Sequence, residues 1–110
     1  MWVDALRSGK YRKGRNWMCS VSNKRASYCA LGVLAKVLGL KFEPMEGSES
    51  RSLMGSTARL PYAVSYPIKL SNADQDWVIG LNDDRVVVPN DNRVIYNNFN
   101  KIADLIEEKL

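Results

Sequence analysis

The most apolar part of the chain is the stretch of residues 28–42, and its pattern predicts a helix that is buried on almost every side. Between Ser27 and Gly39 nearly every residue is apolar, and Lys36 is the charged exception. A helix that is apolar all round belongs at the centre of a core. Ser27 is the candidate N-cap, and Gly39 is the candidate residue just past the C-terminus. Because Gly32 weakens a helix interior relative to alanine, we expect another segment to approach closely there.

The C-terminal end shows the clearest helical period. Its apolar positions fall at i, i+3, i+4, i+7 and i+11, and Asn98 precedes them as a candidate cap. These positions are Phe99, Ile102, Ala103, Ile106 and Leu110. We expect an amphipathic helix whose apolar face joins Leu31, Leu34, Val37 and Leu38 of the central helix in one core.

Two shorter segments also favour helices. Trp2 and Leu6 stand four residues apart near the N-terminus, and Gly9 is a natural terminator. Further along, Ser71 and Asp74 stand three apart, as in a capping box with Asp in place of Glu. The apolar face of this second helix would consist of Trp77, Val78 and Leu81.

Strict alternation of apolar and polar residues predicts two short hairpins. In residues 16–29, Trp17, Cys19 and Val21 alternate with polar neighbours, which is the period of a half-buried strand. A turn centred on residues 23–24 would place Cys19 opposite Tyr28. Residues 85–96 predict a second hairpin, with valines before a Pro-Asn-Asp-Asn turn and a short return strand after it.

The remaining middle part of the chain lacks helical periodicity. Residues 43–58 are rich in Ser, Gly and Glu, which indicates a long surface loop that we expect to be mobile. Residues 62–70 favour an extended segment, which Pro67 confines to a sheet edge. Residues 1–110 are therefore predicted to form a single small α+β domain with a buried central helix, a C-terminal amphipathic helix and two short β-hairpins.

Charge is distributed unevenly along the chain. The net charge of the whole chain is +4, but residues 1–41 carry nine basic residues and one acidic residue, a net charge of +8. The rest of the chain carries seven basic and eleven acidic residues, a net charge of −4. A positive region of this kind attracts phosphate groups or the acidic surface of another protein.

The basic residues of the first segment are the candidate ligand-binding residues, together with an aromatic neighbour. They are Arg7, Lys10, Tyr11, Arg12, Lys13, Arg15, Lys24 and Arg25. Arginine contacts phosphate in a bidentate manner, and an aromatic ring can stack on a base. Core packing is the alternative for Tyr11, and it is the preferred interpretation for Trp17, which alternates with polar residues.

The two basic clusters are expected at opposite ends of the first hairpin, roughly 20–25 Å apart. A nucleic-acid backbone could span that distance and contact both clusters. A single nucleotide could not, and it would use the cluster between Arg7 and Arg15 alone. The sequence leaves both ligands open.

The composition also narrows the possible chemistry. The chain contains no histidine, which excludes Ser–His and Cys–His nucleophilic pairs as well as histidine metal sites. Cys19 and Cys29 lack CxxC spacing, and Cys29 lies among apolar residues, so we interpret it as core packing rather than a reactive thiol. A disulfide between them is disfavoured, because Cys19 would face Tyr28 and cytosolic thiols stay reduced.

The carboxylates suggest no catalytic site either. Asp83 and Asp84 follow a predicted helix and are interpreted as loop and cap residues rather than a divalent-ion site. No glycine-rich phosphate loop has the required spacing. We therefore expect no enzyme, no catalytic residues, no metal and no cofactor.

The chain is also expected to stay away from membranes. Its longest apolar run, residues 29–35, is far shorter than the roughly 20 residues of a membrane span. The first residues do not resemble a secretory signal, because the positive charges follow the amphipathic segment. A cytosolic protein is the expectation.

Several segments resemble a family of small, mostly uncharacterised proteins of tailed bacteriophages. The matching pieces are Trp2, "ALRSGKY" at 5–11, "YCALGVL" at 28–34, "LND" at 81–83 and "FNKIADLIEEKL" at 99–110, 30 residues in all. The family pattern often has two cysteines after the tyrosine, whereas this chain has Cys29 and Ala30. The stretch between "LND" and the last helix is often shorter in the family. The resemblance implies a phage or prophage origin and brings no assigned catalytic residues.

These observations predict a non-enzymatic phage accessory protein that works by binding. The expected ligand is a nucleic acid or a nucleotide, such as a host signalling nucleotide, held by the basic N-terminal face in the cytoplasm of the infected bacterium. The alternative is an inhibitor or adaptor whose basic face binds an acidic surface of a host protein.

Overall fold

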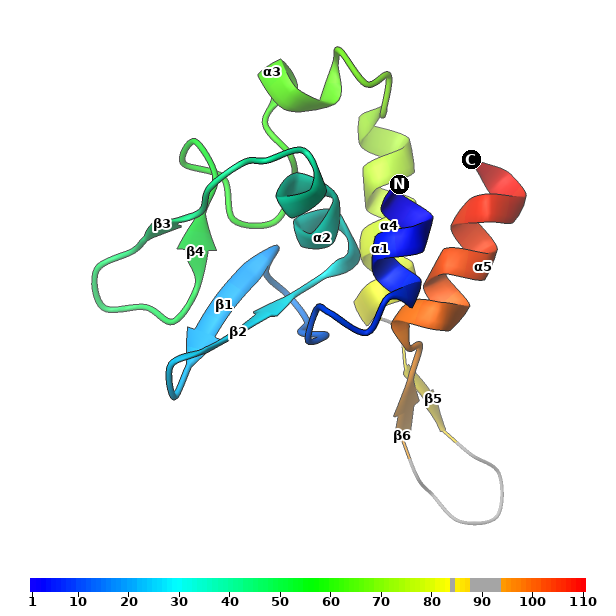
Figure 1. The fold of residues 1–110 in the computed structure, drawn as a ribbon, viewed down its shortest axis with the longest axis horizontal. Helices are drawn as coiled ribbons and strands as arrows, with labels where there is room; N and C mark the ends of the chain where they lie inside the picture. Colours follow the sequence, from blue (N-terminus) through cyan, green and yellow to red (C-terminus); the bar gives the residue numbers. More distant parts are fainter. Residues whose placement is uncertain (84, 88–93) are drawn as a thin grey trace.

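The computed structural model describes residues 1–83, 85–87 and 94–110, which form helices and small antiparallel sheets in one mixed α+β arrangement. Figure 1 shows α5 beside α1 and α4, with α2 between these helices and the first strands. The helices are α1 (Trp2–Arg7), α2 (Ala30–Val37), α3 (Tyr62–Ser65), α4 (Asn72–Asp83) and α5 (Phe99–Lys109). The strands are β1 (Cys19–Ser22), β2 (Arg25–Tyr28), β3 (Glu43–Pro44), β4 (Arg51–Ser52), β5 (Arg85–Val87) and β6 (Val94–Tyr96).

Helix α2 is the buried central helix that the sequence predicts. Leu31 and Val33 are fully buried, and α2 packs against α1, α4 and β2. Gly32 is where the backbone of another segment comes closest: a Cβ on this residue would lie 1.8 Å from the carbonyl oxygen of Met18. Only glycine permits this approach, so the predicted reason for a mid-helix glycine is confirmed.

The ends of α2 agree with the prediction at one end and differ at the other. Gly39 has a φ of +80°, the left-handed conformation expected just past a helix C-terminus. Ser27 was predicted to be the N-cap, which is wrong: Ser27 lies in β2, and Cys29 occupies the cap position. The helix begins two residues later than expected, because Ser27 still pairs with Ser20 in the hairpin ladder and β2 continues to Tyr28.

Helix α1 packs on α2, and α5 packs against α1 and α4. The indole of Trp2 donates a hydrogen bond to the carbonyl oxygen of Ala30 (2.9 Å), which fixes α1 on the start of α2. Asn98 caps α5 as predicted, and its side-chain oxygen accepts a hydrogen bond from the backbone N–H of Lys101 (2.8 Å). The buried residues of α5 are Phe99, Ile102, Ala103 and Ile106. Leu110 was predicted on the same face, but it follows the last turn and is 51% exposed.

The first hairpin has the predicted register. Cys19 pairs with Tyr28 across β1 and β2, and the turn residues Asn23 and Lys24 both have positive φ angles, 53° and 63°. Two positive φ angles define the tight turn whose twist matches that of paired strands. The register follows from this turn.

Trp17 does not lie in the core, contrary to the prediction. It is 43% exposed, whereas its neighbour Met18 is fully buried. The alternation begins only at β1, and Met18 precedes that strand. The backbone N–H of Met18 donates to the carbonyl oxygen of Thr57 (2.8 Å), and its own carbonyl oxygen accepts from Cys29 (3.1 Å), so the chain crosses the core at this residue.

Residues 43–58 are more regular than the predicted surface loop. They contain the paired strands β3 and β4, and Ser50 and Leu53 are buried. The carbonyl oxygen of Glu49 also accepts a hydrogen bond from the backbone N–H of Val21 on the edge of β1 (2.8 Å). The pattern was hidden because each strand has only two residues. The expected mobility of this segment stays a prediction.

The extended segment predicted for residues 62–70 is wrong, because α3 forms there. Pro61 precedes the helix, a position where a fixed φ favours helix initiation. The fully buried Gln75 of α4 holds this region in place, since its side-chain oxygen accepts from the backbone N–H of Leu60 (2.8 Å). The next element, α4, begins as predicted: the hydroxyl of Ser71 accepts from the backbone N–H of Asp74 (3.1 Å).

The second predicted hairpin is present. Strands β5 and β6 pair antiparallel, with Arg85 opposite Tyr96 and Val87 opposite Val94. The predicted Pro-Asn-Asp-Asn turn and Asp84 lie outside the described residues.

Candidate functional site

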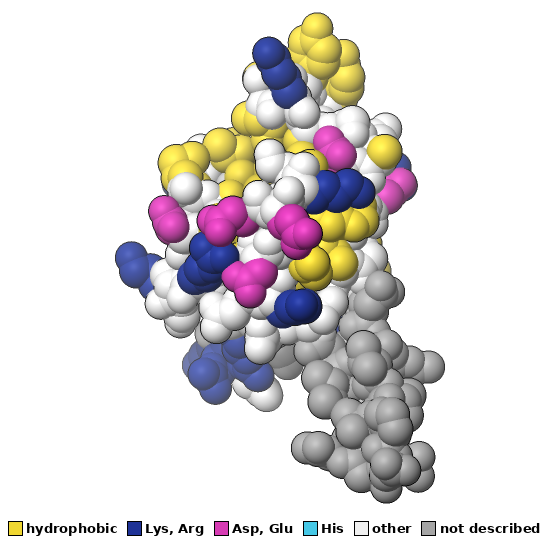
Figure 2. Space-filling view, turned by 90° about the vertical axis from the view of Figure 1, so that its right-hand side faces the viewer, with side chains coloured by type: hydrophobic (Ala, Val, Ile, Leu, Met, Phe, Trp, Pro, Cys, Tyr) yellow, Lys and Arg dark blue, Asp and Glu magenta, His cyan; other side chains and the backbone are white. Residues whose placement is uncertain are grey.

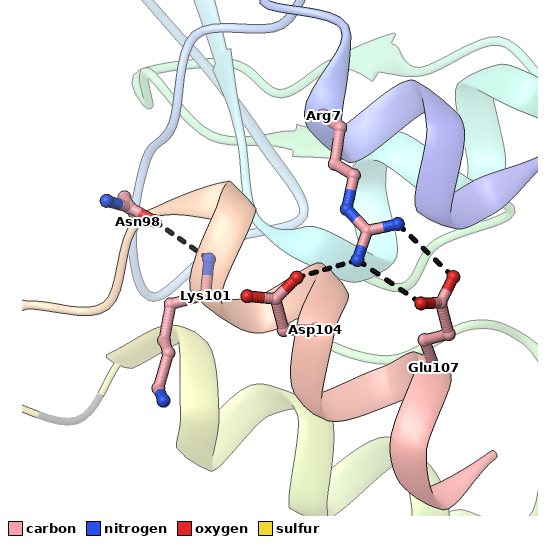
Figure 3. Close-up of polar contacts among 5 residues, drawn as sticks. All are labelled: Arg7, Asn98, Lys101, Asp104 and Glu107. Carbon is pink, nitrogen blue, oxygen red and sulfur yellow. Dashed lines mark hydrogen bonds and ion pairs between the residues drawn. The ribbon is translucent and has the colours of Figure 1, made fainter.

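The predicted ligand-binding residues do not form one cluster. Arg7 instead forms ion pairs that join two helices. Its guanidinium lies between two carboxylates of α5, donating to Asp104 (2.6 Å) and to Glu107 (3.2 Å), as Figure 3 shows. These hydrogen bonds raise the pKa of Arg7. Arg7 thereby joins α1 to α5.

Residues 10–15 form a basic loop that lies against β2. The backbone N–H of Tyr28 donates to the carbonyl oxygen of Arg12 (2.8 Å), and the N–H of Gly14 donates back to the carbonyl oxygen of Tyr28 (2.8 Å). The ring of Tyr11 meets the ring of Tyr28 edge-on at a centroid distance of 5.6 Å. Tyr11 is therefore partly in the core and partly at the surface, between the two interpretations made from the sequence.

Lys13 is directed toward the protein rather than outward. Its ammonium group donates to the carbonyl oxygen of Asn82 near the end of α4 (2.9 Å). Burial lowers the pKa of Lys13, and the nearby carboxylate of Asp83 opposes that shift. A lysine at a helix C-terminus also complements the helix dipole. Lys13 therefore anchors the basic loop.

Asn82, in the "LND" segment, has a structural role. Its side chain is fully buried: Oδ1 accepts from the first backbone N–H of α2, that of Ala30 (3.2 Å), and Nδ2 donates to the carbonyl oxygen of Gly14 (3.0 Å) and to Asp83 (3.0 Å). Asp83 in turn accepts from the backbone N–H of Asn16 (3.2 Å). These two residues hold the basic loop to the start of α2, and sequence analysis missed the role of Asn82.

Lys24 and Arg25 lie at the other end of the hairpin, as expected. Both are exposed, and Arg25 pairs with Ser22 next to the turn. Because side chains alternate along a strand, Arg25 and Ser27 lie on the face of β2 opposite to Ala26 and Tyr28. The structure thus separates these two cations from the basic loop.

The other face of the hairpin forms one wall of a cleft of about 400 Å³. Cys19, Val21, Ala26 and Tyr28 share this face because they stand two apart in each strand. Phe42 also lines the cleft, with its ring centroid 6.3 Å from that of Tyr28. A volume of this size lies in the range of small-molecule sites.

Three cations line the same cleft, and sequence analysis did not name them as site residues. Lys36 comes from the last turn of α2, Lys41 from the segment that follows, and Arg51 from β4. The described lining residues include no carboxylate. The sequence could have pointed to part of this set, because Lys36 and Lys41 belong to the positively charged residues 1–41. Only the tertiary fold brings Arg51 beside them.

The pKa of the Cys19 thiol, which lines the cleft, also reflects the nearby cations. Burial raises the pKa of the Cys19 thiol, while the nearby Arg51 and Lys36 oppose that shift. Both cations are therefore close enough to act on the same buried group. A thiol with a raised pKa is a poor nucleophile, so the cleft offers charge and aromatic surface rather than a reactive sulfur.

The cysteines are core residues, as predicted. Both Cys19 and Cys29 are buried and free, and burial raises the pKa of Cys29 to about 11. Among the residues that the structure describes, no group of three or more His, Cys, Asp or Glu side chains could hold a metal ion. Within the same residues, no helix has the length and apolar character needed to cross a membrane.

Comparison with known proteins gives one family. No curated protein and no solved structure matches the chain. A family model described as a domain of unknown function, DUF8296, matches residues 1–110. The chain therefore belongs to the DUF8296 family of domains of unknown function.

Proposed function

We propose that this protein binds a phosphate-bearing ligand, a nucleotide or a nucleic acid, in the cleft beside the first hairpin. The observation that carries the proposal is the convergence of Lys36, Lys41 and Arg51 on a cleft that also contains the rings of Tyr28 and Phe42. Cations contact phosphate through charge-assisted hydrogen bonds, and aromatic rings accept a base by stacking.

The proposed role is binding without catalysis. The whole chain lacks histidine, and the one thiol in the cleft has a pKa that is raised rather than lowered. A phage accessory protein that acts in the cytoplasm of the infected bacterium fits the segments "ALRSGKY" and "YCALGVL" discussed above. Such a protein could capture a host signalling nucleotide or coat a nucleic acid.

The test measures the affinity of the full chain for nucleoside mono- and diphosphates by titration calorimetry. Lys36→Ala and Arg51→Ala should each weaken binding by about 10-fold or more, because each removes a charge-assisted hydrogen bond worth roughly 1.5–3 kcal/mol. Lys24→Ala is the matched control, since it removes the same charge from an exposed position outside the cleft. An equal loss in the control would show a general charge effect and would contradict the cleft.

The second candidate function is an adaptor or inhibitor that binds a host protein with an acidic surface. A separate observation favours it: Tyr62 of α3 and Tyr66, which follows the helix, are 74% and 68% exposed and stack at 5.1 Å, next to Lys69. Figure 2 shows exposed hydrophobic side chains at the top of the molecule, where α3 lies. Exposed tyrosines are typical of protein interfaces. Tyr62→Ser with Tyr66→Ser should abolish capture of such a partner and leave nucleotide affinity unchanged.

A further inference from the structure

The aromatic wall of the cleft lies next to the basic loop. Tyr28 contacts Phe42 on the cleft side at 6.3 Å and Tyr11 on the loop side at 5.6 Å between ring centroids. All three rings are partly exposed. Phe42, Tyr28 and Tyr11 therefore form a continuous aromatic row that joins two regions far apart in the sequence.

The position of the basic loop beside this row is fixed by the backbone. Lys13 pairs with Tyr28 in a parallel bridge, and two further hydrogen bonds join Tyr28 to Arg12 and Gly14. The loop thus follows the edge of β2 with its residues in a defined register. Exposed Lys10 and Arg12 lie at this end of the row, whereas Lys36, Lys41 and Arg51 lie at the other.

From this arrangement we infer that the ligand is single-stranded nucleic acid, which runs from the cleft across Tyr28 to the basic loop. The inference rests on the proposed function of the cleft and names its ligand class. Proteins that bind single strands combine a positive groove with aromatic rings on which successive bases stack. A mononucleotide would need the cleft alone and would leave Tyr11 and Arg12 unused.

The orientation of the rings favours a single strand over a duplex. Neighbouring bases in a duplex strand are stacked about 3.4 Å apart. The rings of Tyr11 and Tyr28 are inclined to each other by 88°, and those of Tyr28 and Phe42 by 50°. Bases that stack on these rings cannot remain stacked on one another, so the strand that follows the row is unpaired.

Two of the basic residues predicted from the sequence lie away from the proposed path of the nucleic acid. Arg7 is held by Asp104 and Glu107 on α5, and Arg25 lies on the opposite face of β2. Figure 2 shows that acidic side chains lie among Lys and Arg side chains on the side of the molecule with α5, whereas the described lining of the cleft holds cations and no carboxylate. The proposed path therefore follows the hairpin side.

The experiment measures fluorescence anisotropy of labelled oligothymidylates of 2 to 12 nucleotides at several salt concentrations. Unlabelled dTMP competes for the cleft. Affinity should rise at least 10-fold from the shortest to the longest strand and exceed that for a duplex of equal length by a similar factor. Arg12→Ala should weaken binding of the 12-mer and reduce the slope of log affinity against log salt by about one, as expected for one lost phosphate contact.

The controls separate this inference from the proposed function. Arg12→Ala should not change competition by dTMP, and it keeps the backbone oxygen that Tyr28 requires. Lys24→Ala should leave both affinity and salt slope unchanged. If dTMP and the 12-mer bind equally well and Arg12→Ala has no effect, the strand path is wrong and the cleft remains a nucleotide site. If the duplex binds more tightly than the single strand, the inference is overturned; if no probe binds, both proposals are.

Discussion

Single residues in this protein carry structural requirements that their type alone does not reveal. Gly32 and Gly80 are both helical glycines, yet their surroundings are opposite. A Cβ on Gly32 would overlap the backbone of Met18, whereas a Cβ on Gly80 would meet nothing within 4 Å. The same substitution should therefore have opposite effects at the two positions.

Gly32→Ala should destabilise the protein by about 3 kcal/mol, because the backbone of Met18 cannot move aside as a flexible side chain could. Gly80→Ala is the control, and it should stabilise the protein by up to about 1 kcal/mol through helix propensity. Urea unfolding measures both. Equal effects at the two sites would show that α2 does not approach Met18 as closely as described.

Cys29 gives the protein a pH dependence in the alkaline range. Burial raises the pKa of its thiol from an ordinary value of 9.0 to about 11, so the unfolded chain releases this proton at a lower pH than the folded chain does. The contribution of the Cys29 thiol to the free energy of unfolding is fully present below pH 9 and is lost as the pH rises toward 11. Between pH 8 and pH 10.5 the wild-type protein should lose about 2 kcal/mol more than Cys29→Ala. Parallel stability curves for the two proteins would contradict the buried thiol.

At the scale of elements, the β3–β4 segment combines an anchored part with an exposed part. Ser50 and Leu53 are buried, whereas residues 45–49 are all exposed. Pro44 and Arg51, on either side of that exposed turn, line the cleft. This segment therefore combines an exposed turn, which we expect a protease to reach, with a wall of the proposed site.

A glutamate-specific protease should cut first after Glu46 or Glu49, because the turn offers few apolar anchors. The matched control lies within the same chain: Glu107 and Glu108 are also exposed but belong to α5, and they should be cut later. Mass spectrometry of early fragments identifies the sites. Oligothymidylate should slow the first cut if it fills the cleft, and first cleavage within α5 would contradict the prediction.

For the whole molecule, α2 is the element on which the others depend. It packs against α1, α4 and β2, and its apolar residues join those of α5 in one cluster. One core of this kind predicts a single cooperative unfolding transition.

Leu34→Ala should destabilise the protein by roughly 2–5 kcal/mol through lost burial and a cavity, while unfolding stays a single transition. Leu110→Ala is the control at a residue that is 51% exposed, and it should change stability by less than about 0.5 kcal/mol. Unfolding followed by both fluorescence and circular dichroism tests cooperativity. Two separate transitions, or a loss below about 1 kcal/mol for Leu34→Ala, would contradict a core centred on α2.

Local pattern was sufficient for those elements that carry their own signal. The apolar run of α2, the stripe of α5 with its Asn98 cap, and the register of Cys19 with Tyr28 all follow from period, capping and turn chemistry within a few residues. The same reasoning failed where short-range pattern is weak. Two-residue strands have no measurable period, Trp17 lies just outside its strand, and α3 is a single turn after Pro61.

The candidate site depended on the tertiary structure, because its parts come from distant segments. The sequence by itself determined that positive charge is concentrated in residues 1–41 and that no histidine chemistry is available. Only the fold decided that Arg7 pairs with α5, that Lys13 anchors on Asn82, and that Arg51 joins Lys36 and Lys41 at one cleft. Local pattern records the burial of each residue along its own element, whereas a binding cleft depends on which elements meet, and that is set by packing between residues far apart in the chain.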